Sequence, residues 1–192
     1  IGLDRPSILR TQFQALLKAS AGKTLHVMFP FIAQVSEFDD VKRILVDERN
    51  ALEREGEKLP TAIKIGVMIE IPSLLWQLDA LMERVDFVSI GSNDLMQFLF
   101  ACDRGAAHLV GRYDTLSPIM LCVVKQIVET AKKHNVEVSF CGEMARRPID
   151  ALALIGLGVR SLSVSAVAIG PLKAMIRSMS VSEFTPYLDY IT

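Results

Sequence analysis

Apolar residues recur along the chain in two alternating patterns, which predict strands and helices in turn. Short, nearly continuous runs rich in Val, Ile and Leu are typical of strands buried on both faces, and residues spaced three or four apart predict amphipathic helices. The strands are expected at 24–29, 63–69, 87–90, 136–140 and 161–164. The helices are expected from Asp4 to Gly22, from Ser36 to about Glu55, from Pro72 past Leu81, from near Asn93, from Ser117 to near His134, from Pro148 to Gly158, and from about Ala168 to Met179.

The first few residues are expected to form the end of a strand. Ile1 to Asp4 resembles the last part of such a strand, and Asp4 is expected to cap the following helix, with Pro6 in its first turn.

Strands that alternate with helices at similar spacing predict a parallel sheet with right-handed crossovers. Two architectures remain open from this pattern: an open doubly wound sheet and a (β/α)8 barrel. A full barrel typically needs about 250 residues, whereas this chain has 192.

Composition narrows the class of protein. The chain is 51% hydrophobic, but its apolar runs are far shorter than the roughly 20 residues of a membrane-spanning helix. The formal net charge is −1, and no basic cluster indicates a nucleic-acid surface. Three cysteines at wide spacing indicate neither a disulfide framework nor a C-x-x-C metal site. We therefore expect a reducing, cytoplasmic location.

Polar residues follow four of the expected strands. In parallel α/β folds, the chemistry lies at the carboxyl ends of the strands. The residues found there are Glu70, the segment Gly91-Ser92-Asn93-Asp94, the segment Cys141-Gly142-Glu143, and Ser163 with Ser165. We expect them to converge on one rim of the sheet.

Each candidate has a chemical interpretation and a structural alternative. Glu70 and Asp94 together suit Mg²⁺, which takes one or two protein carboxylates and substrate oxygens, although either acid could simply favour a helix N-terminus. Arg104 could bind a phosphate or carboxylate, or it could pair with Asp103 at the surface. Cys141 ends an apolar strand, which is typical of a buried, inert thiol, but Gly142 and Glu143 favour a position at the rim.

Taken together and in this order, these segments resemble the PEP-utilising enzymes. The matching segments are Val67-Met68-Ile69-Glu70-Ile71-Pro72, Ser89-Ile90-Gly91-Ser92-Asn93-Asp94-Leu95, Asp103-Arg104-Gly105, Ser117-Pro118 and Cys141-Gly142-Glu143. Within the family, Asp103-Arg104-Gly105 is more similar to enzyme I of the bacterial phosphotransferase system than to pyruvate phosphate dikinase or PEP synthase. The segments 74–79 and 94–98 look closer to the nitrogen-related paralogue of enzyme I.

The resemblance implies an incomplete (β/α)8 barrel of about five to six βα units and a role for each candidate. Glu70 and Asp94 match residues that hold Mg²⁺, and Asn93 and Arg104 match residues that contact the phosphate of phosphoenolpyruvate (PEP). Cys141 matches the acid that protonates the enolate carbon as pyruvate forms. The phosphoryl group would pass to a histidine on a separate domain and then to an HPr-type carrier, and the barrel would form a homodimer.

This chain also differs from the family that it resembles. Family members carry further PEP-binding arginines on the first three barrel strands, which would precede Ile1. We therefore expect residues 1–192, a single partial barrel domain, to bind PEP weakly and to transfer no phosphoryl group alone. Two other functions remain open: a non-catalytic regulatory or dimerisation module, and a lyase or aldolase of the wider PEP/pyruvate barrel superfamily, against which Arg104 and Cys141 argue.

Overall fold

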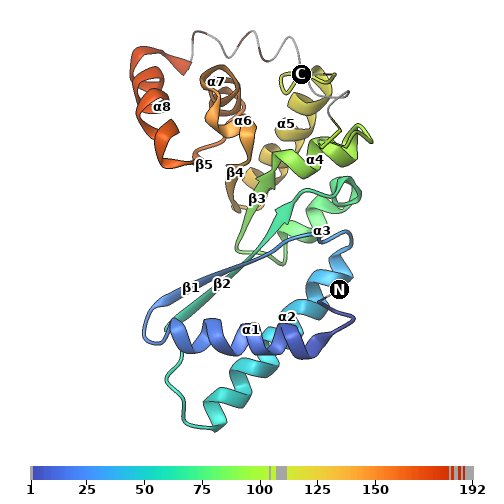
Figure 1. Ribbon diagram of the computed structural model, residues 1–192, viewed down its shortest axis with the longest axis vertical. Coiled ribbons are helices and arrows are strands. Elements are labelled where there is room, and N and C mark those ends of the chain that lie inside the picture. The colour runs from blue at the N-terminus through green and yellow to red at the C-terminus, as the bar shows by residue number, and fades with distance from the viewer. Residues whose placement is uncertain are drawn as a thin grey trace.

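A twisted sheet of five parallel strands forms the centre of the computed structural model, which describes residues 2–103, 105–106, 112–181, 183, 186 and 188 (Figure 1). Each expected apolar run is confirmed as a strand, and the ends differ by at most one residue. The strands are β1 (Thr24–Phe29), β2 (Ala62–Ile69), β3 (Phe87–Gly91), β4 (Glu137–Cys141) and β5 (Ser161–Ser163).

The order of the strands decides between the two architectures. They pair in parallel in the sequence β1-β2-β3-β4-β5, without the reversal that defines a doubly wound sheet. Right-handed crossovers between strands in sequential order place every connecting helix on the same face. That arrangement is the one found in a (β/α) barrel, so the sheet is a segment of such a barrel.

Helices connect the strands and cover one face of the sheet. Figure 1 shows the sheet extending from β1 and β2, beside α1 and α2, to β4 and β5, beside α6, α7 and α8. The helices are α1 (Pro6–Ala19), α2 (Val35–Arg54), the 3-10 helix η1 (Pro72–Gln77), α3 (Leu78–Met82), α4 (Ser92–Leu99), α5 (Pro118–Lys133), α6 (Glu143–Arg146), α7 (Pro148–Gly156) and α8 (Ala166–Ser178).

Two local expectations were wrong. Residues 2–4 form a turn instead of the end of a strand, because β2 is the only strand that pairs with β1 among the described residues. The cap position of α1 is Arg5 instead of Asp4, with no side-chain hydrogen bond at the cap. A third expectation, the helix from Pro72, is confirmed in position, but its first part is a 3-10 helix, in which the Leu74 N–H donates to the Ile71 carbonyl at 3.1 Å.

Alternation along the strands separates the covered face from the open face. In β1, Leu25, Val27 and Phe29 are buried, whereas the intervening residues are exposed. The Phe29 ring lies 5.9 Å from those of Phe13 on α1 and Phe38 on α2. The buried set therefore faces the helices, and the other set lines the side that corresponds to the interior of a barrel.

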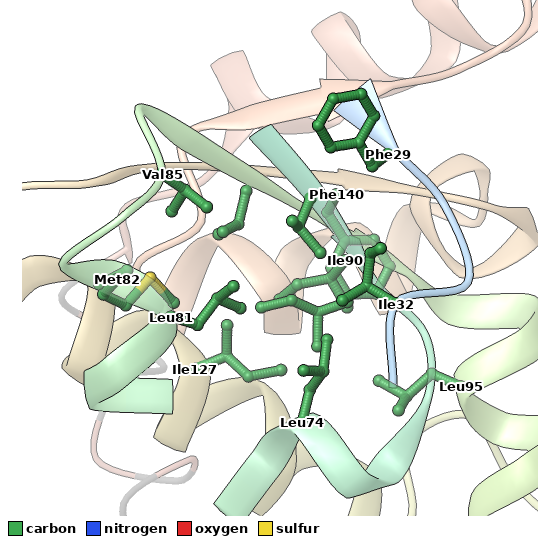
Figure 2. Packing of buried hydrophobic residues seen from close by; sticks show 14 of the residues in the cluster. Phe29, Ile32, Leu74, Leu81, Met82, Val85, Ile90, Leu95, Ile127 and Phe140 are labelled. Atoms are coloured by element: carbon green, nitrogen blue, oxygen red, sulfur yellow. The ribbon is translucent and has the colours of Figure 1, made fainter. Parts of the chain in front are cut away.

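The core lies between the covered face of the sheet and the helices. Figure 2 shows Ile90 of β3 and Phe140 of β4 close to Leu74, Leu81 and Ile127 from three helices. All five side chains are fully shielded from solvent. This packing fixes the ends of β3 and β4, where the candidate residues lie.

No helix in the described part of the chain is both long enough and apolar enough to span a bilayer.

The fold makes a prediction about Gly66, which lies opposite Phe87 in the β2–β3 register. A Cβ at Gly66 would lie 2.6 Å from the Phe87 carbonyl oxygen and 2.5 Å from its ring. Because a backbone oxygen in a sheet cannot move aside, Gly66→Ala should lower the free energy of unfolding by about 1–3 kcal/mol, as measured by urea denaturation.

The matched control is Gly170→Ala in α8, where the added Cβ meets nothing within 4 Å. It should leave stability unchanged or raise it by about 0.5–1 kcal/mol through helix propensity. Equal stability of the Gly66→Ala variant and the wild type would contradict the close approach of β2 and β3.

Candidate functional site

Glu70 is a buried carboxylate at the carboxyl end of β2. Its exposed fraction is 2%, because the loop after β1 closes over it. Oε1 accepts a hydrogen bond of 2.7 Å from the backbone N–H of Phe31 in that loop. A buried acid with a defined hydrogen bond is held in one orientation, as a ligand-binding group must be.

Asp94 lies close enough to Glu70 to change its ionisation. Burial is the main cause that raises the pKa of Glu70 above its ordinary value of 4.5, and the nearby negative charge of Asp94 raises that pKa further. The Phe31 N–H opposes both effects without cancelling them. The structure therefore brings together the two carboxylates that the strand-end rule identified.

Two hydrogen bonds join the end of β3 to the end of β4. Ser92 Oγ, at the start of α4, donates to the Cys141 carbonyl at 2.9 Å. The backbone N–H of Glu143 donates to Asn93 Oδ1 at 3.0 Å. The first turn of α4, which carries Asp94, is thereby fixed against the loop after β4.

Gly142 makes this close approach possible. Its φ is +104°, a backbone conformation that favours glycine. A Cβ at this position would lie 2.2 Å from Ser92 Oγ and 3.0 Å from Asn93 Oδ1. The glycine between Cys141 and Glu143 is therefore required by both conformation and space.

Cys141 is the last residue of β4 and lies opposite Gly91 in the β3–β4 register. Its Sγ is 3.7 Å from Ser89 Oγ and 3.5 Å from the Ile90 carbonyl oxygen. Cys141 as a residue is partly exposed and not sealed in the core. Among the two interpretations of this cysteine, the structure favours the rim position.

Arg104, which was predicted to contact phosphate, lies outside the described residues. Its neighbour Asp103 accepts a hydrogen bond of 2.8 Å from the Gly105 N–H. Ser163, the last residue of β5, lies opposite Cys141 in the β4–β5 register and therefore belongs to the same edge of the sheet.

The donor set is compatible with Mg²⁺. Within the ranges that the structure describes, no group of three or more His, Cys, Asp or Glu side chains forms a complete metal cage. Mg²⁺ commonly keeps several waters and binds through one or two carboxylates together with substrate phosphate. The paired carboxylates of Glu70 and Asp94 match that requirement.

Sequence patterns missed another buried acid near this edge of the fold, Asp150, in the first turn of α7. It has no exposed surface, and its Oδ2 accepts a hydrogen bond of 2.8 Å from Thr115 Oγ1 and lies 3.4 Å from Arg147 Nη1. Burial is the main cause that raises the pKa of Asp150, while Thr115 and Arg147 lower it and Asp114 adds to the increase. Asp150 thereby connects α7 to Thr115, which lies shortly before α5. In the sequence, an Asp three residues after an Arg gave no sign that this side chain would be buried.

The sequence matches the family described as "PEP-utilising enzyme, PEP-binding domain" over residues 1–181. The chain therefore belongs to the PEP-binding domain family of the PEP-utilising enzymes.

Curated proteins similar to this chain carry the name phosphoenolpyruvate-protein phosphotransferase. The chain is 39% identical to that of Priestia megaterium over 189 residues, which cover 98% of this chain and 33% of the relative. It is 40% identical to that of Staphylococcus carnosus over 181 residues, which cover 94% and 32%. The chain thus spans about a third of the length of the curated relatives that it matches.

Solved structures show the same fold at low sequence identity. A citrate lyase from Burkholderia xenovorans LB400 superposes with a TM-score of 0.65 at 18% identity, over 95% of this chain and 57% of the other. An HpcH/HpaI aldolase from Desulfitobacterium hafniense DCB-2 superposes with a TM-score of 0.55 at 16% identity, over 88% and 67%. At these identities the likeness concerns the fold alone, and it agrees with a partial barrel.

The raised pKa of Glu70 predicts a pH-dependent gain in stability for Glu70→Gln. When the pKa of a carboxyl is higher in the folded than in the unfolded chain, the protein loses stability as the pH rises between those two pKa values. Each pKa unit of difference corresponds to about 1.4 kcal/mol of stability. In metal-free buffer at pH 7, the variant should unfold at higher urea concentration than the wild type. The gain should disappear on acidification below the ordinary glutamate range.

Glu53→Gln, on the exposed side of α2, is the matched control and should show no such gain. A Glu70→Gln variant that is less stable than the wild type at pH 7 and equally so in acid would contradict the burial of an ionised Glu70.

Gly142 supports a second prediction, with Gly158 as its control. Both glycines have φ above +100°, a region that residues with a Cβ seldom adopt, so alanine at either position should cost on the order of 1–3 kcal/mol in backbone strain. Only Gly142→Ala should also displace Ser92 and Asn93, whereas a Cβ at Gly158 lies 3.1 Å from Val128 in the core. Backbone NMR shifts at Ser92–Asp94 should therefore change in Gly142→Ala and remain in place in Gly158→Ala. Equal changes of these NMR shifts in both variants would contradict a specific contact of Gly142 with Ser92 and Asn93.

Proposed function

We propose that this chain is the PEP-binding part of a PEP-dependent protein phosphotransferase. The observation that carries the proposal is the meeting of a buried Glu70, the charge of Asp94 and the first turn of α4 at one edge of the sheet, with Cys141 beside them. Membership of the family and similarity to proteins named phosphoenolpyruvate-protein phosphotransferase support the assignment of the substrate.

Glu70 and Asp94 hold Mg²⁺ in this proposal. When bound there, the ion neutralises charge on the carboxylate and phosphate of PEP. Phosphoryl transfer depends on positioning and electrostatic stabilisation more than on covalent help from side chains. The hydrogen bonds that fix α4 against the loop after β4 provide that positioning.

Asn93 and Arg104 bind the phosphate group. Asn93 lies in the first turn of α4, where free backbone N–H groups attract anions. The side-chain amide of Asn93 is held in place by its Oδ1, which accepts from the Glu143 N–H, and its amide N–H donates to a phosphate oxygen in this proposal. Arg104 adds a guanidinium, which matches phosphate geometry.

Cys141 supplies a proton. When the bond between phosphorus and the bridging oxygen of PEP breaks, a new bond forms between phosphorus and a histidine nitrogen on another domain. The enolate of pyruvate that remains takes a proton at C3 from the Cys141 thiol. Ser89 Oγ, 3.7 Å from Sγ, can donate to the thiolate that is left.

The proposal extends to partners that lie beyond this chain. The phosphorylated histidine passes its phosphoryl group to an HPr-type carrier, or to the nitrogen-branch counterpart of that carrier. Segments 74–79 and 94–98 favour the nitrogen-related paralogue of enzyme I. We place the protein in the cytoplasm as a homodimer, and we expect residues 1–192 alone to bind PEP weakly.

The test is Cys141→Ala in the full-length protein that carries this sequence. The rate of pyruvate formation from PEP is measured in an assay coupled to lactate dehydrogenase. It should fall by at least about 100-fold because the proton donor is lost. Cys122→Ala, on an exposed position of α5, should retain wild-type activity.

Unchanged pyruvate formation in Cys141→Ala would contradict the assigned role and favour a non-catalytic regulatory or dimerisation module. Carbon–carbon cleavage products in place of pyruvate formation would favour a lyase.

A further inference from the structure

We propose that Phe31 is a positioning residue whose backbone N–H, not its ring, holds Glu70 so that only Oε2 is presented to a cation. The inference rests on the proposed role of Glu70 as a metal ligand. It assigns a function to the loop between β1 and α2. None of the candidate residues predicted from the sequence lies in this loop.

The two oxygens of Glu70 have different surroundings. Oε1 accepts the 2.7 Å hydrogen bond from the Phe31 N–H. Oε2 faces Gly91 at the end of β3, where an added Cβ would lie 3.1 Å from it. Because Asp94 is in the first turn of the helix that begins after Gly91, Oε2 is the oxygen on the side of the second carboxylate. Glu70 is therefore arranged to bind a cation through one oxygen.

Phe31 makes this hydrogen bond from a backbone conformation that phenylalanine seldom adopts. Its φ is +55°, in the left-handed region, which costs about 1–2 kcal/mol for a residue with a Cβ. Such conformations persist only where the surrounding structure holds them, and they are enriched at functional sites. The conformation turns the Phe31 N–H toward the buried carboxylate.

Contacts of the residues that follow Phe31 hold the loop in place. Ile32 is buried and lies among Leu74, Ile90 and Leu95 in the core (Figure 2). The Ala33 carbonyl accepts hydrogen bonds from Ser73 Oγ at 2.8 Å and from Gln77 Nε2 at 3.2 Å. Gln77 Oε1 also accepts from the backbone N–H of Val35 at 3.1 Å. The loop is thus anchored to the core and to η1, which begins two residues after Glu70.

The ring of Phe31 contributes little to this arrangement. It is 58% exposed and meets the ring of Phe98 on α4 edge-on, with centroids 6.3 Å apart. An exposed aromatic pair of this kind stabilises by less than the roughly 0.5–1.5 kcal/mol of a buried one. The conformation of the backbone, and not the side chain, is therefore the feature to test.

The experiment compares three substitutions at Phe31 by titration with Mn²⁺ alone. Electron paramagnetic resonance measures the concentration of the free ion at each step. Phe31→Gly and Phe31→Asn retain the N–H and tolerate the left-handed conformation, so both should bind Mn²⁺ as the wild type does. Phe31→Val disfavours that conformation and should weaken binding by about tenfold, as loss of a group that orients a metal ligand does. Phe98→Leu, which removes the ring contact alone, should have no effect.

Equal Mn²⁺ affinity of Phe31→Val and the wild type would overturn the inference, as would equal losses in Phe31→Gly and Phe31→Val. Hydrogen exchange of the Phe31 amide, measured by NMR on the unaltered chain, provides a second test that needs no variant to fold. Slow exchange is expected for an N–H that donates to a buried carboxylate, and exchange as fast as that of exposed loop amides would overturn the hydrogen bond. If the wild type bound no Mn²⁺ either alone or with PEP present, the proposed metal site itself would be wrong, and the inference would fall with it.

Discussion

The site depends on a buried carboxylate placed next to a second negative charge. Glu70 is shielded from water, and both burial and Asp94 raise its pKa. A fold retains such an arrangement only if the packing around it is strong enough to offset the electrostatic cost. Here the fully buried side chains of Ile69 and Leu95 are the chain neighbours of Glu70 and Asp94, and the fully buried Ile90 lies four residues before Asp94. In the proposed metal site, a cation offsets the repulsion between these two negative charges.

The barrel topology brings the remaining groups to the same place. Because β2, β3 and β4 are parallel neighbours, the segments that follow them begin at one edge of the sheet. Ser92 and Asn93 then bond to the chain on either side of Gly142, so the spacing between α4 and the Cys141 segment is set by backbone geometry. Family membership and the chemistry of these groups both support the proposal that this rim binds PEP.

Much of this arrangement could be predicted from the sequence, because it follows from local patterns. The apolar runs located all five strands, and the rule that chemistry lies at strand ends led to Glu70, Asp94 and Cys141. The pattern could not reveal the role of Phe31, since an aromatic residue after Pro30 carries no sign of a left-handed φ. The burial of Asp150 was missed for a related reason: it depends on how α7 meets Thr115, a contact between segments far apart in the chain.

The most direct test of the central claim is the pKa of Glu70, measured by carbon-13 NMR of its side-chain carboxyl in the wild type and in Asp94→Asn, without metal. If the two carboxylates share one site, the wild-type pKa lies above the ordinary glutamate value, and removing the charge of Asp94 lowers it. An unchanged pKa in Asp94→Asn would show that the two acids do not face each other, and it would contradict the shared cation site.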